Sequence, residues 1–332
     1  MTLILNSKDV EKAINMRSII QWIEKGVVEE RNGSVEMPPR VNMSTNNLGF
    51  FRLMPAVLNE SGIMGYKAFA GSRKTGKTRY AIALMDQEEN DMIAMMDAHY
   101  LTAVRTGATT GLATKYLARE NAKKVGVIGS GFEARTNLEG VCAVRNIEQV
   151  KVFSPTPHRR ELFAQEMSGK LNVQIEAVDS AVKAVEGVDI VIVATNTSSK
   201  GGSGIAFEGN WIQPGMHVNS IGSTMPVLRE IDAESFARAD FIIVDTLQVE
   251  EESGDVLDAL KQGKYDRTKV IHLKEIVAGG RKVRTDDQQV TLFKSVGTAI
   301  QDIMAAQAVY EEARRLGLGT DVGEFLELKL FS

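Results

Sequence analysis

A glycine turn in the middle of the chain is the first residue pattern that could do chemistry. Gly129 and Gly131 are followed by Ala134 in the spacing Gly-x-Gly-x-x-Ala, directly after the apolar run Val125–Ile128. The first glycine allows a tight turn, the second lets backbone approach a pyrophosphate, and the small third residue lets helix pack on strand. The helix that begins here would present its amino end to the phosphates. The pattern predicts a dinucleotide site; the alternative is a glycine-rich turn that binds no ligand.

The end of the second predicted strand indicates which dinucleotide is bound. NAD sites usually carry an Asp or Glu there for the ribose 2′-hydroxyl, whereas this chain has Ser154 with Arg159 shortly after it. An uncharged residue near an arginine suits a 2′-phosphate, so we predict NADP, with NAD as the alternative. The basic residues could instead form the solvent-facing first turn of a helix. The predicted cofactor residues of these two segments are Gly129, Ser130, Gly131, Phe132, Glu133, Ala134, Ser154, Thr156, His158 and Arg159.

Short apolar runs around the glycine turn indicate the sheet that would position it. They are separated by helical stretches, and strands this apolar are typical of a parallel sheet covered on both faces. We therefore predict an α/β protein with a Rossmann-type doubly wound parallel sheet. The predicted strands are Val125–Ile128, Val150–Phe153, Ile190–Ala194, His217–Ile221 and Phe241–Val244.

The two ends of the chain are predicted to form a second, mixed α+β domain. Residues 37–97 alternate between apolar and polar side chains and are interrupted by turn residues, which predicts antiparallel hairpins. A helix is expected over Ala98–Leu117 and a longer one over Thr291–Leu316. We expect residues 121–316 to form the Rossmann domain and residues 1–120 with 317–332 to form the other.

The bulk composition excludes several classes of protein. The 332 residues are 43% hydrophobic and 25% charged, with a net charge of −4, as in a folded chain of two domains. Lys and Arg are scattered, so no nucleic-acid partner is expected. No apolar run approaches the ~18 residues of a membrane helix. The single cysteine, Cys142, forms no intrachain disulfide and is given no catalytic role; with no secretory signal at the amino end, we expect a cytoplasmic protein.

Four stretches of this chain resemble the ornithine cyclodeaminase/mu-crystallin family. They are Leu101-Thr-Ala-Val-Arg-Thr-Gly-Ala, Gly129-Ser-Gly-Phe-Glu-Ala-Arg, Glu252-Ser-Gly-Asp-Val and Thr291-Leu-Phe-Lys-Ser-Val-Gly-Thr-Ala-Ile-Gln-Asp. The resemblance covers nearly the whole length. It implies a homodimer in which the amino-terminal sheet forms both the dimer contact and the substrate pocket. It also implies a small amino or imino acid as the substrate.

The resemblance implies that Arg40, Lys67 and Arg105 hold the substrate carboxylate. A planar guanidinium can grip a carboxylate through two hydrogen bonds. Lys67 could also exchange a proton with the substrate nitrogen if burial lowers its pKa. Without the resemblance, each residue would be taken for a surface cation with a salt-bridge partner.

The resemblance also assigns further residues to the cofactor. Thr106 is expected near the phosphates, and Lys294 and Ser295 beside the nicotinamide; Thr195, which follows a predicted strand, is included with them. The alternative for Lys294 and Ser295 is that they only cap or solvate the long carboxy-terminal helix.

One position departs from the family's cyclodeaminases. The cyclodeaminases of the family look to carry the run Gly-x-Asp-x-Pro-Gly-Lys, which contains their catalytic Asp. This chain has Gly222-Ser-Thr-Met-Pro-Val-Leu at the same place, so Thr224 stands in the position of that Asp. A threonine hydroxyl has neither the charge nor the basicity to steer a distal amine onto an imine carbon. Simple hydride transfer at a C–N bond does not need that carboxylate.

Three functions follow from these observations. The first is an NAD(P)-dependent oxidoreductase of the ketimine or pyrroline-carboxylate reductase or amino-acid dehydrogenase type. The second is an ornithine cyclodeaminase, a lyase that uses bound NAD, in which Asp86 or Asp97 would replace the missing carboxylate. The third is a binding protein that holds NADP and a small carboxylate without chemistry, as the mu-crystallin relatives suggest.

Overall fold

The chain forms two compact units that differ in extent from the predicted domains. The structure is a computed structural model that describes residues 1–332 except 47–48, 73, 196–203 and 328–332. The first unit contains Met1–Arg105 and Thr298–Ser332, and the second contains Thr106–Gly297. The boundaries therefore lie near 105 and 297 instead of 120 and 316, because the long carboxy-terminal helix packs within the first unit. Each unit is described separately below.

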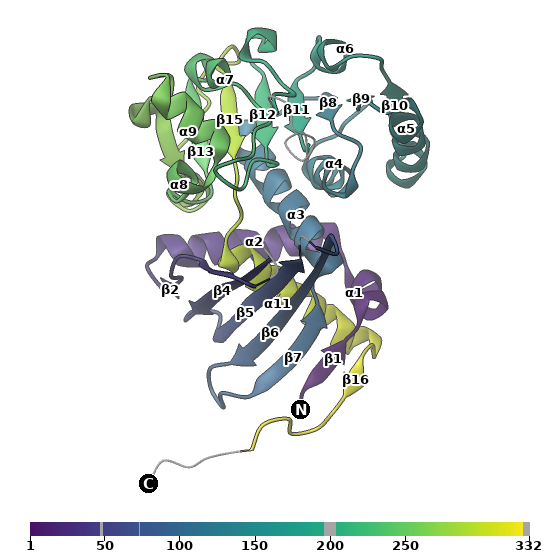
Figure 1. Ribbon diagram of the computed structural model, residues 1–332, viewed down its shortest axis with the longest axis vertical. Coiled ribbons are helices and arrows are strands. Elements are labelled where there is room, and N and C mark those ends of the chain that lie inside the picture. The colour runs from purple at the N-terminus through teal and green to yellow at the C-terminus, as the bar shows by residue number, and fades with distance from the viewer. Residues whose placement is uncertain (47–48, 73, 196–203, 328–332) are drawn as a thin grey trace. The chain divides into compact units, whose positions relative to one another are not determined.

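The first unit is a mixed sheet with helices packed on it (Figure 1). The sheet order is β16-β1-β7-β6-β5-β4-β2, with β3 paired to β4; β1 and β7 are parallel and the other pairs are antiparallel. Its strands are β1 (Leu3–Leu5), β2 (Val35–Glu36), β3 (Val41–Ser44), β4 (Phe50–Leu58), β5 (Ile63–Ser72), β6 (Lys77–Asp86), β7 (Met92–Asp97) and β16 (Thr320–Asp321). Its helices are α1 (Ser7–Ala13), α2 (Met16–Arg31) and α11 (Ala299–Leu316).

Helix α11 covers the centre of this sheet. It packs against β4, β5, β6 and α2. The approach is close at two glycines: a Cβ on Gly26 of α2 would lie 2.6 Å from Met304 Cγ, and one on Gly65 of β5 would lie 3.1 Å from Ile303 Cδ1. Because side chains alternate along a strand, β5 turns Gly65 and Lys67 toward α11 and Tyr66 toward the opposite face.

The second unit is the predicted doubly wound parallel sheet. All its strands are parallel, in the order β10-β9-β8-β11-β12-β15-β13-β14. The strands are β8 (Lys124–Ile128), β9 (Gln149–Phe153), β10 (Gln174–Ala177), β11 (Ile190–Val193), β12 (His217–Ser220), β13 (Phe241–Val244), β14 (Val270–His272) and β15 (Thr291–Lys294). The helices are α4 (Phe132–Val144), α5 (Pro157–Leu171), α6 (Ala181–Val185), α7 (Ala233–Arg238), α8 (Val249–Glu252), α9 (Gly254–Lys261) and α10 (Leu273–Val277), with short 3-10 turns at Gly209–Trp211 and Arg267–Lys269. Helix α3 (His99–Leu117) spans the boundary between the units.

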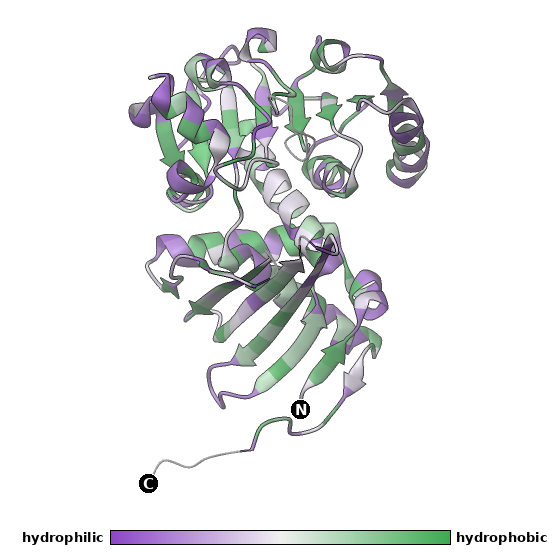
Figure 2. Cartoon of the chain, in the orientation of Figure 1, coloured by the Kyte–Doolittle hydropathy of each residue, from purple (hydrophilic) through white to green (hydrophobic). Residues whose placement is uncertain are grey.

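The apolar runs in the sequence are the strands of this sheet, and the Rossmann-type prediction is confirmed. The central strands β11 and β12 are buried along their whole length, and the strands of the sheet are largely hydrophobic in Figure 2. Even the imidazole of His217 is enclosed, between Thr291 Oγ1 at 2.9 Å and Asn219 Oδ1 at 3.2 Å. Within the described residues, no helix is long and apolar enough to cross a bilayer.

The predicted helix over Thr291–Leu316 is wrong in its first part. Thr291–Lys294 is strand β15, which lies between β12 and β13 and is buried throughout. Gly297 follows in the left-handed backbone region, with a φ of +80°. Helix α11 begins only at Ala299, after its N-cap Thr298. Leu292 and Phe293 are too short an apolar run for periodicity alone to separate strand from helix.

Candidate active site

The glycine turn has the geometry that a pyrophosphate site needs. Gly129 follows β8 with a φ of +120°, and a Cβ there would lie 2.2 Å from the carbonyl oxygen of Ala194. Gly131 is the N-cap of α4, and a Cβ there would meet no atom within 4 Å. One glycine is thus required by the fold, whereas the space in front of the other is open to a ligand. The residues present fit a dinucleotide.

The sheet topology places this turn at a ligand-binding edge. The strand order reverses between β8 and β11, and in open parallel sheets ligands bind outside the carboxyl ends of the strands at such a switch point. Ala134, at the third motif position, is fully buried where α4 packs on β8. Helices α3 and α4 also approach closely, since a Cβ on Gly107 would lie 2.1 Å from the carbonyl oxygen of Thr136. Thr106 is the neighbour of Gly107 in α3.

The segment after β9 offers hydroxyl and basic groups and has a serine in place of the usual carboxylate. Ser154 is buried, and its hydroxyl lies 2.8 Å from that of Ser130 in the glycine turn. Thr156, His158 and Arg159 are exposed at the start of α5. Arg160, which was not assigned to the cofactor, donates to the carbonyl oxygen of Ser154 at 3.0 Å. Of the two neighbouring arginines, Arg160 therefore holds the strand end.

In the first unit, Lys67 and Arg105 lie together around one carboxylate. Lys67 comes from the middle of β5 and is 1% exposed; Arg105 comes from α3 and is also buried. Lys67 Nζ lies 2.8 Å from Asp302 Oδ1 and 2.7 Å from Oδ2. Arg105 donates from Nε to Asp302 Oδ1 at 2.9 Å and from Nη1 to Gln301 Oε1 at 2.9 Å. Two of the three predicted substrate residues are therefore brought into one buried cluster.

Burial and neighbouring cations tune the ammonium of Lys67. Burial lowers the pKa of Lys67 from 10.5 to about 8; Asp302 opposes this shift, whereas Arg105 and Arg40 add to it. Arg40, half-buried just before β3, is thus near enough for its charge to act on Lys67. A lysine with a pKa near 8 can give up or accept a proton at neutral pH, which an ordinary surface lysine cannot.

An aromatic surface adjoins the lysine. Lys67 Nζ lies 5.3 Å from the ring centroid of Phe69, two residues along β5. That ring stacks on Tyr80 of β6, with centroids 5.0 Å apart and planes 14° from parallel. The guanidinium of Arg52, from β4, lies 5.3 Å from the same Phe69 centroid. Cationic groups beside flat rings suit a small, planar, carboxylate-bearing molecule.

The sequence did not point to Asp302, Gln301 or the aromatic residues. Asp302 and Gln301 close the stretch Thr291–Asp302 that carries the family resemblance, and an acid in the first turn of a helix is common. Only the pairing of β5 with β4 and β6, together with the position of α11 over β5, brings them to Lys67.

Thr224 lies in a segment that is held at its base by a buried ion cluster. Glu230 accepts hydrogen bonds from Ser220 Oγ at 2.7 Å and from the Gly222 amide at 2.6 Å. Asp255 accepts from the Glu230 amide at 2.8 Å. Burial raises the pKa of Glu230, and the charge of Asp255 raises it further. Thr224 itself is half-buried within this segment.

Lys294 and Ser295, which the resemblance places beside the nicotinamide, make buried contacts with acidic residues. Lys294 is fully buried, with Nζ 3.0 Å from Asp255 Oδ2 and 2.9 Å from Ser220 Oγ. Ser295 donates to Asp245 Oδ2 at 2.6 Å. Neither residue caps the long helix or is solvated, which were the alternatives. Thr195, the remaining residue assigned to the cofactor, donates its amide to Glu230 Oε2 at 3.2 Å. These three residues all contact acidic side chains near the carboxyl ends of the strands.

The two carboxylates considered as substitutes for the missing Asp are placed away from Lys67. Asp86 pairs with Ile63, four residues along β5 from Lys67, which is about 13 Å. Asp97 pairs with Ala81 and lies on the opposite face of the sheet from Lys67. Neither lies in the cluster around Lys67.

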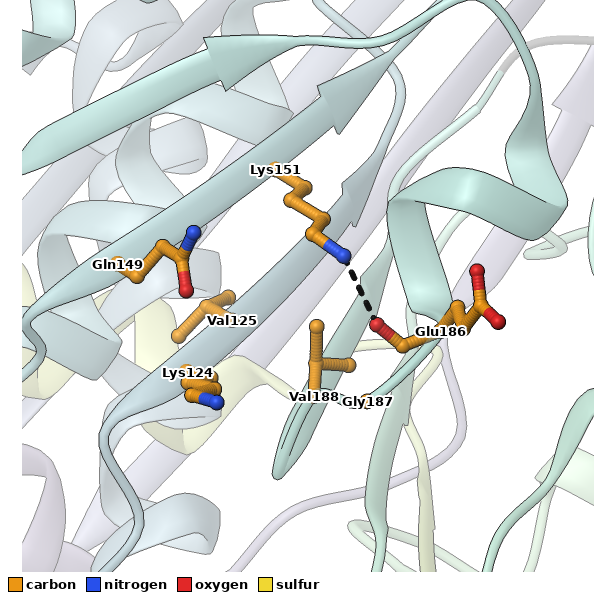
Figure 3. Close-up of a pocket in the computed structure, with 7 residues that line it drawn as sticks. All are labelled: Lys124, Val125, Gln149, Lys151, Glu186, Gly187 and Val188. Atoms are coloured by element: carbon orange, nitrogen blue, oxygen red, sulfur yellow. Dashed lines mark hydrogen bonds between the residues drawn. The ribbon is translucent and has the colours of Figure 1, made fainter.

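A surface hollow of the second unit lies away from the dinucleotide edge. It is lined by residues at the amino ends of β8 and β9 and by the loop before β11, and Lys151 Nζ donates to the Glu186 carbonyl oxygen at 3.0 Å (Figure 3). The glycine turn follows the carboxyl end of β8, at the other edge of the sheet. The hollow is therefore not the cofactor site. Burial raises the pKa of the Cys142 thiol to about 12, so the thiol stays protonated near neutral pH.

Comparison with known proteins assigns the family. The sequence profile of the ornithine cyclodeaminase/mu-crystallin family matches residues 1–316, and the chain belongs to this family. It is 30% identical over 325 residues to a Δ1-pyrroline-2-carboxylate reductase of Bacillus cereus, covering 96% of this chain and 98% of that protein.

Two solved structures are similar over almost their whole length. The first is Thermococcus litoralis Δ1-pyrroline-2-carboxylate reductase in complex with NADH and L-proline, at 39% identity and a TM-score of 0.89, covering 96% of this chain and 100% of that one. The second is an archaeal alanine dehydrogenase dimer with bound NAD, at 30% identity and a TM-score of 0.88, covering 98% and 99%.

Proposed function

We propose that this protein is an NAD(P)-dependent oxidoreductase that reduces a small cyclic imino acid to the corresponding amino acid. The observation that carries the proposal is the buried lysine of lowered pKa beside a buried arginine, in a chain similar to reductases that act on pyrroline-2-carboxylate. A binding protein has no need of a lysine that is poised to exchange a proton. The absence of an aspartate at position 224 favours simple reduction over cyclodeamination.

The residues of the first unit account for the substrate side of the reaction. Arg105 and Arg40 bind the substrate carboxylate and so fix the molecule by its anionic end. Lys67, as an ammonium, donates its proton to the imine nitrogen while the α-carbon gains a hydride, which the bound nicotinamide supplies. The C=N bond becomes a C–N single bond, and Lys67 is left as a neutral amine that regains a proton from water. In the oxidative direction the neutral amine of Lys67 accepts that proton.

A substrate panel tests the proposal directly. Purified protein is mixed with Δ1-pyrroline-2-carboxylate and either NADH or NADPH, and the absorbance of the reduced cofactor is followed. L-proline and L-alanine with oxidised cofactor test the reverse direction, and ornithine tests cyclodeamination through release of ammonia. We expect oxidation of reduced cofactor with the cyclic imine. The proposal fails if no imine consumes reduced cofactor.

We further propose that NADP is the preferred cofactor. The support is the serine at the end of β9 and the exposed Arg159 at the start of α5, which suit a 2′-phosphate. We expect Arg159→Ala to lower kcat/KM for NADPH by roughly tenfold and to leave kcat/KM for NADH within about twofold. Arg281→Ala, at an exposed site in a loop of the same unit, is the matched control. Equal losses with both cofactors would contradict the preference.

We also propose a homodimer built on the open face of the first unit's sheet. The face opposite α11 presents Tyr66, Val41 and Met43 as exposed apolar side chains, and Phe51 and Leu53 pair across β3 on the same face. Contiguous apolar surface of this kind usually marks a protein–protein contact. An isologous pair of such faces would bury them.

A charge on that face is expected to dissociate the dimer. Val41→Asp puts a carboxylate among apolar partners, which strongly disfavours association. Sedimentation velocity should show a shift from dimer to monomer mass. Val182→Asp on α6 is the matched control, because Val182 is 47% exposed and Val41 is 45% exposed. If both variants remain dimers, the interface lies elsewhere.

A further inference from the structure

Asp302 contacts two of the three cations of the proposed substrate pocket, Lys67 and Arg105, although it does not belong to the predicted set. It lies in the first turn of α11, and its side chain is completely buried. Its Oδ1 accepts from Lys67 Nζ and from Arg105 Nε at 2.8 and 2.9 Å, and its Oδ2 lies 2.7 Å from Lys67 Nζ. The carboxylate of Asp302 thus fixes the side chains of Lys67 in β5 and Arg105 in α3 relative to each other.

The charges of this trio match the substrate that we propose. Lys67 and Arg105 carry two positive charges and Asp302 one negative charge, which leaves one positive charge for the substrate carboxylate. Without Asp302, two buried cations would face each other without compensation, and Lys67 would relieve the repulsion by losing its proton. The other charged groups that act on Lys67 are cations as well: Arg40 before β3 lowers its pKa, and Arg52 of β4 shares the Phe69 ring with it.

The element that carries Asp302 is held firmly. Helix α11 packs against the sheet and α2, and the packing leaves no room for a Cβ at Gly26, which would lie 2.6 Å from Met304 Cγ and 2.8 Å from Ile300 Cγ2. Gln301, the preceding residue, accepts from Arg105 Nη1 at 2.9 Å. A carboxylate in the first turn of a helix is also favoured by the helix dipole. The position of Asp302 is therefore set by packing and is independent of the substrate.

We propose that Asp302 is a positioning residue that orients Lys67 and Arg105 and keeps Lys67 charged until the substrate arrives. It acts through these two side chains and does not touch the substrate. The inference rests on the proposed function, because it assigns the roles of Lys67 and Arg105 in imine reduction. It adds a requirement: the proton that reaches the imine nitrogen is retained on Lys67 by a carboxylate that is completely buried.

The pH profile of kcat/KM for reduction of Δ1-pyrroline-2-carboxylate tests this role in the full-length protein. In Asp302→Asn the neutral amide no longer favours the ammonium, so we expect the alkaline limb to move at least one pH unit to lower pH and kcat/KM at pH 8 to fall roughly fivefold or more. Asp302→Glu keeps the charge, and its limb should stay within about half a unit of the wild type. Profiles of both variants that overlay the wild type after scaling would overturn the proposal, since a purely structural residue lowers activity without moving a limb.

A second measurement keeps the proposal open to test if Asp302→Asn does not fold. The double variant Lys67→Met/Asp302→Asn leaves Arg105 as one uncompensated cation of this trio, whereas Asp302→Asn alone leaves two cations facing each other, which a buried site tolerates less well. In Lys67→Met alone, Asp302 still neutralises Arg105. The double variant leaves the charge of Arg105 to the substrate carboxylate, so we expect it to bind L-proline roughly tenfold or more tightly in calorimetry. Equal affinities of the two variants for L-proline would show that Asp302 does not act on Arg105. Absence of turnover and of L-proline binding in the wild type would defeat the proposed function itself, whereas wild-type turnover with unmoved limbs defeats only the role of Asp302.

Discussion

Replacing Lys67 by methionine is expected to abolish most of the imine reduction. Methionine fills a similar volume but carries no proton to donate, and general acid catalysis contributes roughly 100- to 10,000-fold to a rate. We therefore expect kcat for the cyclic imine to fall by roughly that factor. Steady-state rates with Δ1-pyrroline-2-carboxylate measure it. Affinity for the dinucleotide, measured by fluorescence titration, should be unchanged, because the glycine turn belongs to a different unit.

The pH dependence of the wild type provides the accompanying test, with opposite signs in the two directions. The folded protein holds the pKa of Lys67 at about 8, so the ammonium predominates below pH 8 and the amine above it. Reduction needs the ammonium; kcat/KM should be flat below pH 8 and fall about tenfold per unit above it. Oxidation needs the amine; kcat/KM should rise with pH and level off above 8. Limbs of the same sign in both directions would exclude Lys67 as the proton carrier.

Replacing Gly131 by alanine is expected to weaken cofactor binding and to leave folding stability almost unchanged. The backbone there has an ordinary φ of −78°, and the added Cβ would meet no protein atom within 4 Å, so we expect stability to change by about 1 kcal/mol or less. The methyl group would occupy space that the motif reserves for the pyrophosphate, and the Kd for the dinucleotide should rise roughly tenfold or more.

Gly129→Ala is the matched comparison at the other glycine. Its Cβ would lie 2.2 Å from the Ala194 carbonyl oxygen, and the φ of +120° is strained for any side chain. This variant should therefore lose thermal stability as well as cofactor affinity. A Gly131→Ala protein that binds the dinucleotide as tightly as the wild type would show that the turn does not hold the pyrophosphate.

Local signals predicted the nucleotide-binding half well. The run Val125–Ile128, the glycine spacing and the small Ala134 each depend on neighbours within about ten residues, and the structure assembles them as expected. Periodicity failed at Thr291–Lys294, where a short apolar run is equally compatible with a strand and a buried helix. Its burial between two other strands is a property of the sheet and has no local signature.

The substrate pocket was predicted only in part, because its contacts are distant in sequence. Lys67 and Asp302 are 235 positions apart, and Arg105 and Asp302 are 197 apart. The two cations could be named from the family resemblance, but the carboxylate between them is defined by the packing of α11 over β5. Lys294 is a further example: the sequence did not indicate its buried partner, Asp255.

The ion cluster beneath Gly222–Glu230 has a consequence for which positions of this segment can tolerate substitution. The groups that hold this segment, Ser220, Glu230, Asp255 and Lys294, are buried, whereas Met225 and Val227 in its middle are exposed. Substitutions at the exposed positions leave the buried anchors intact. Mutation can therefore change the exposed side chains of this segment without disturbing the buried groups that hold it, so its surface and its folding are free to evolve separately.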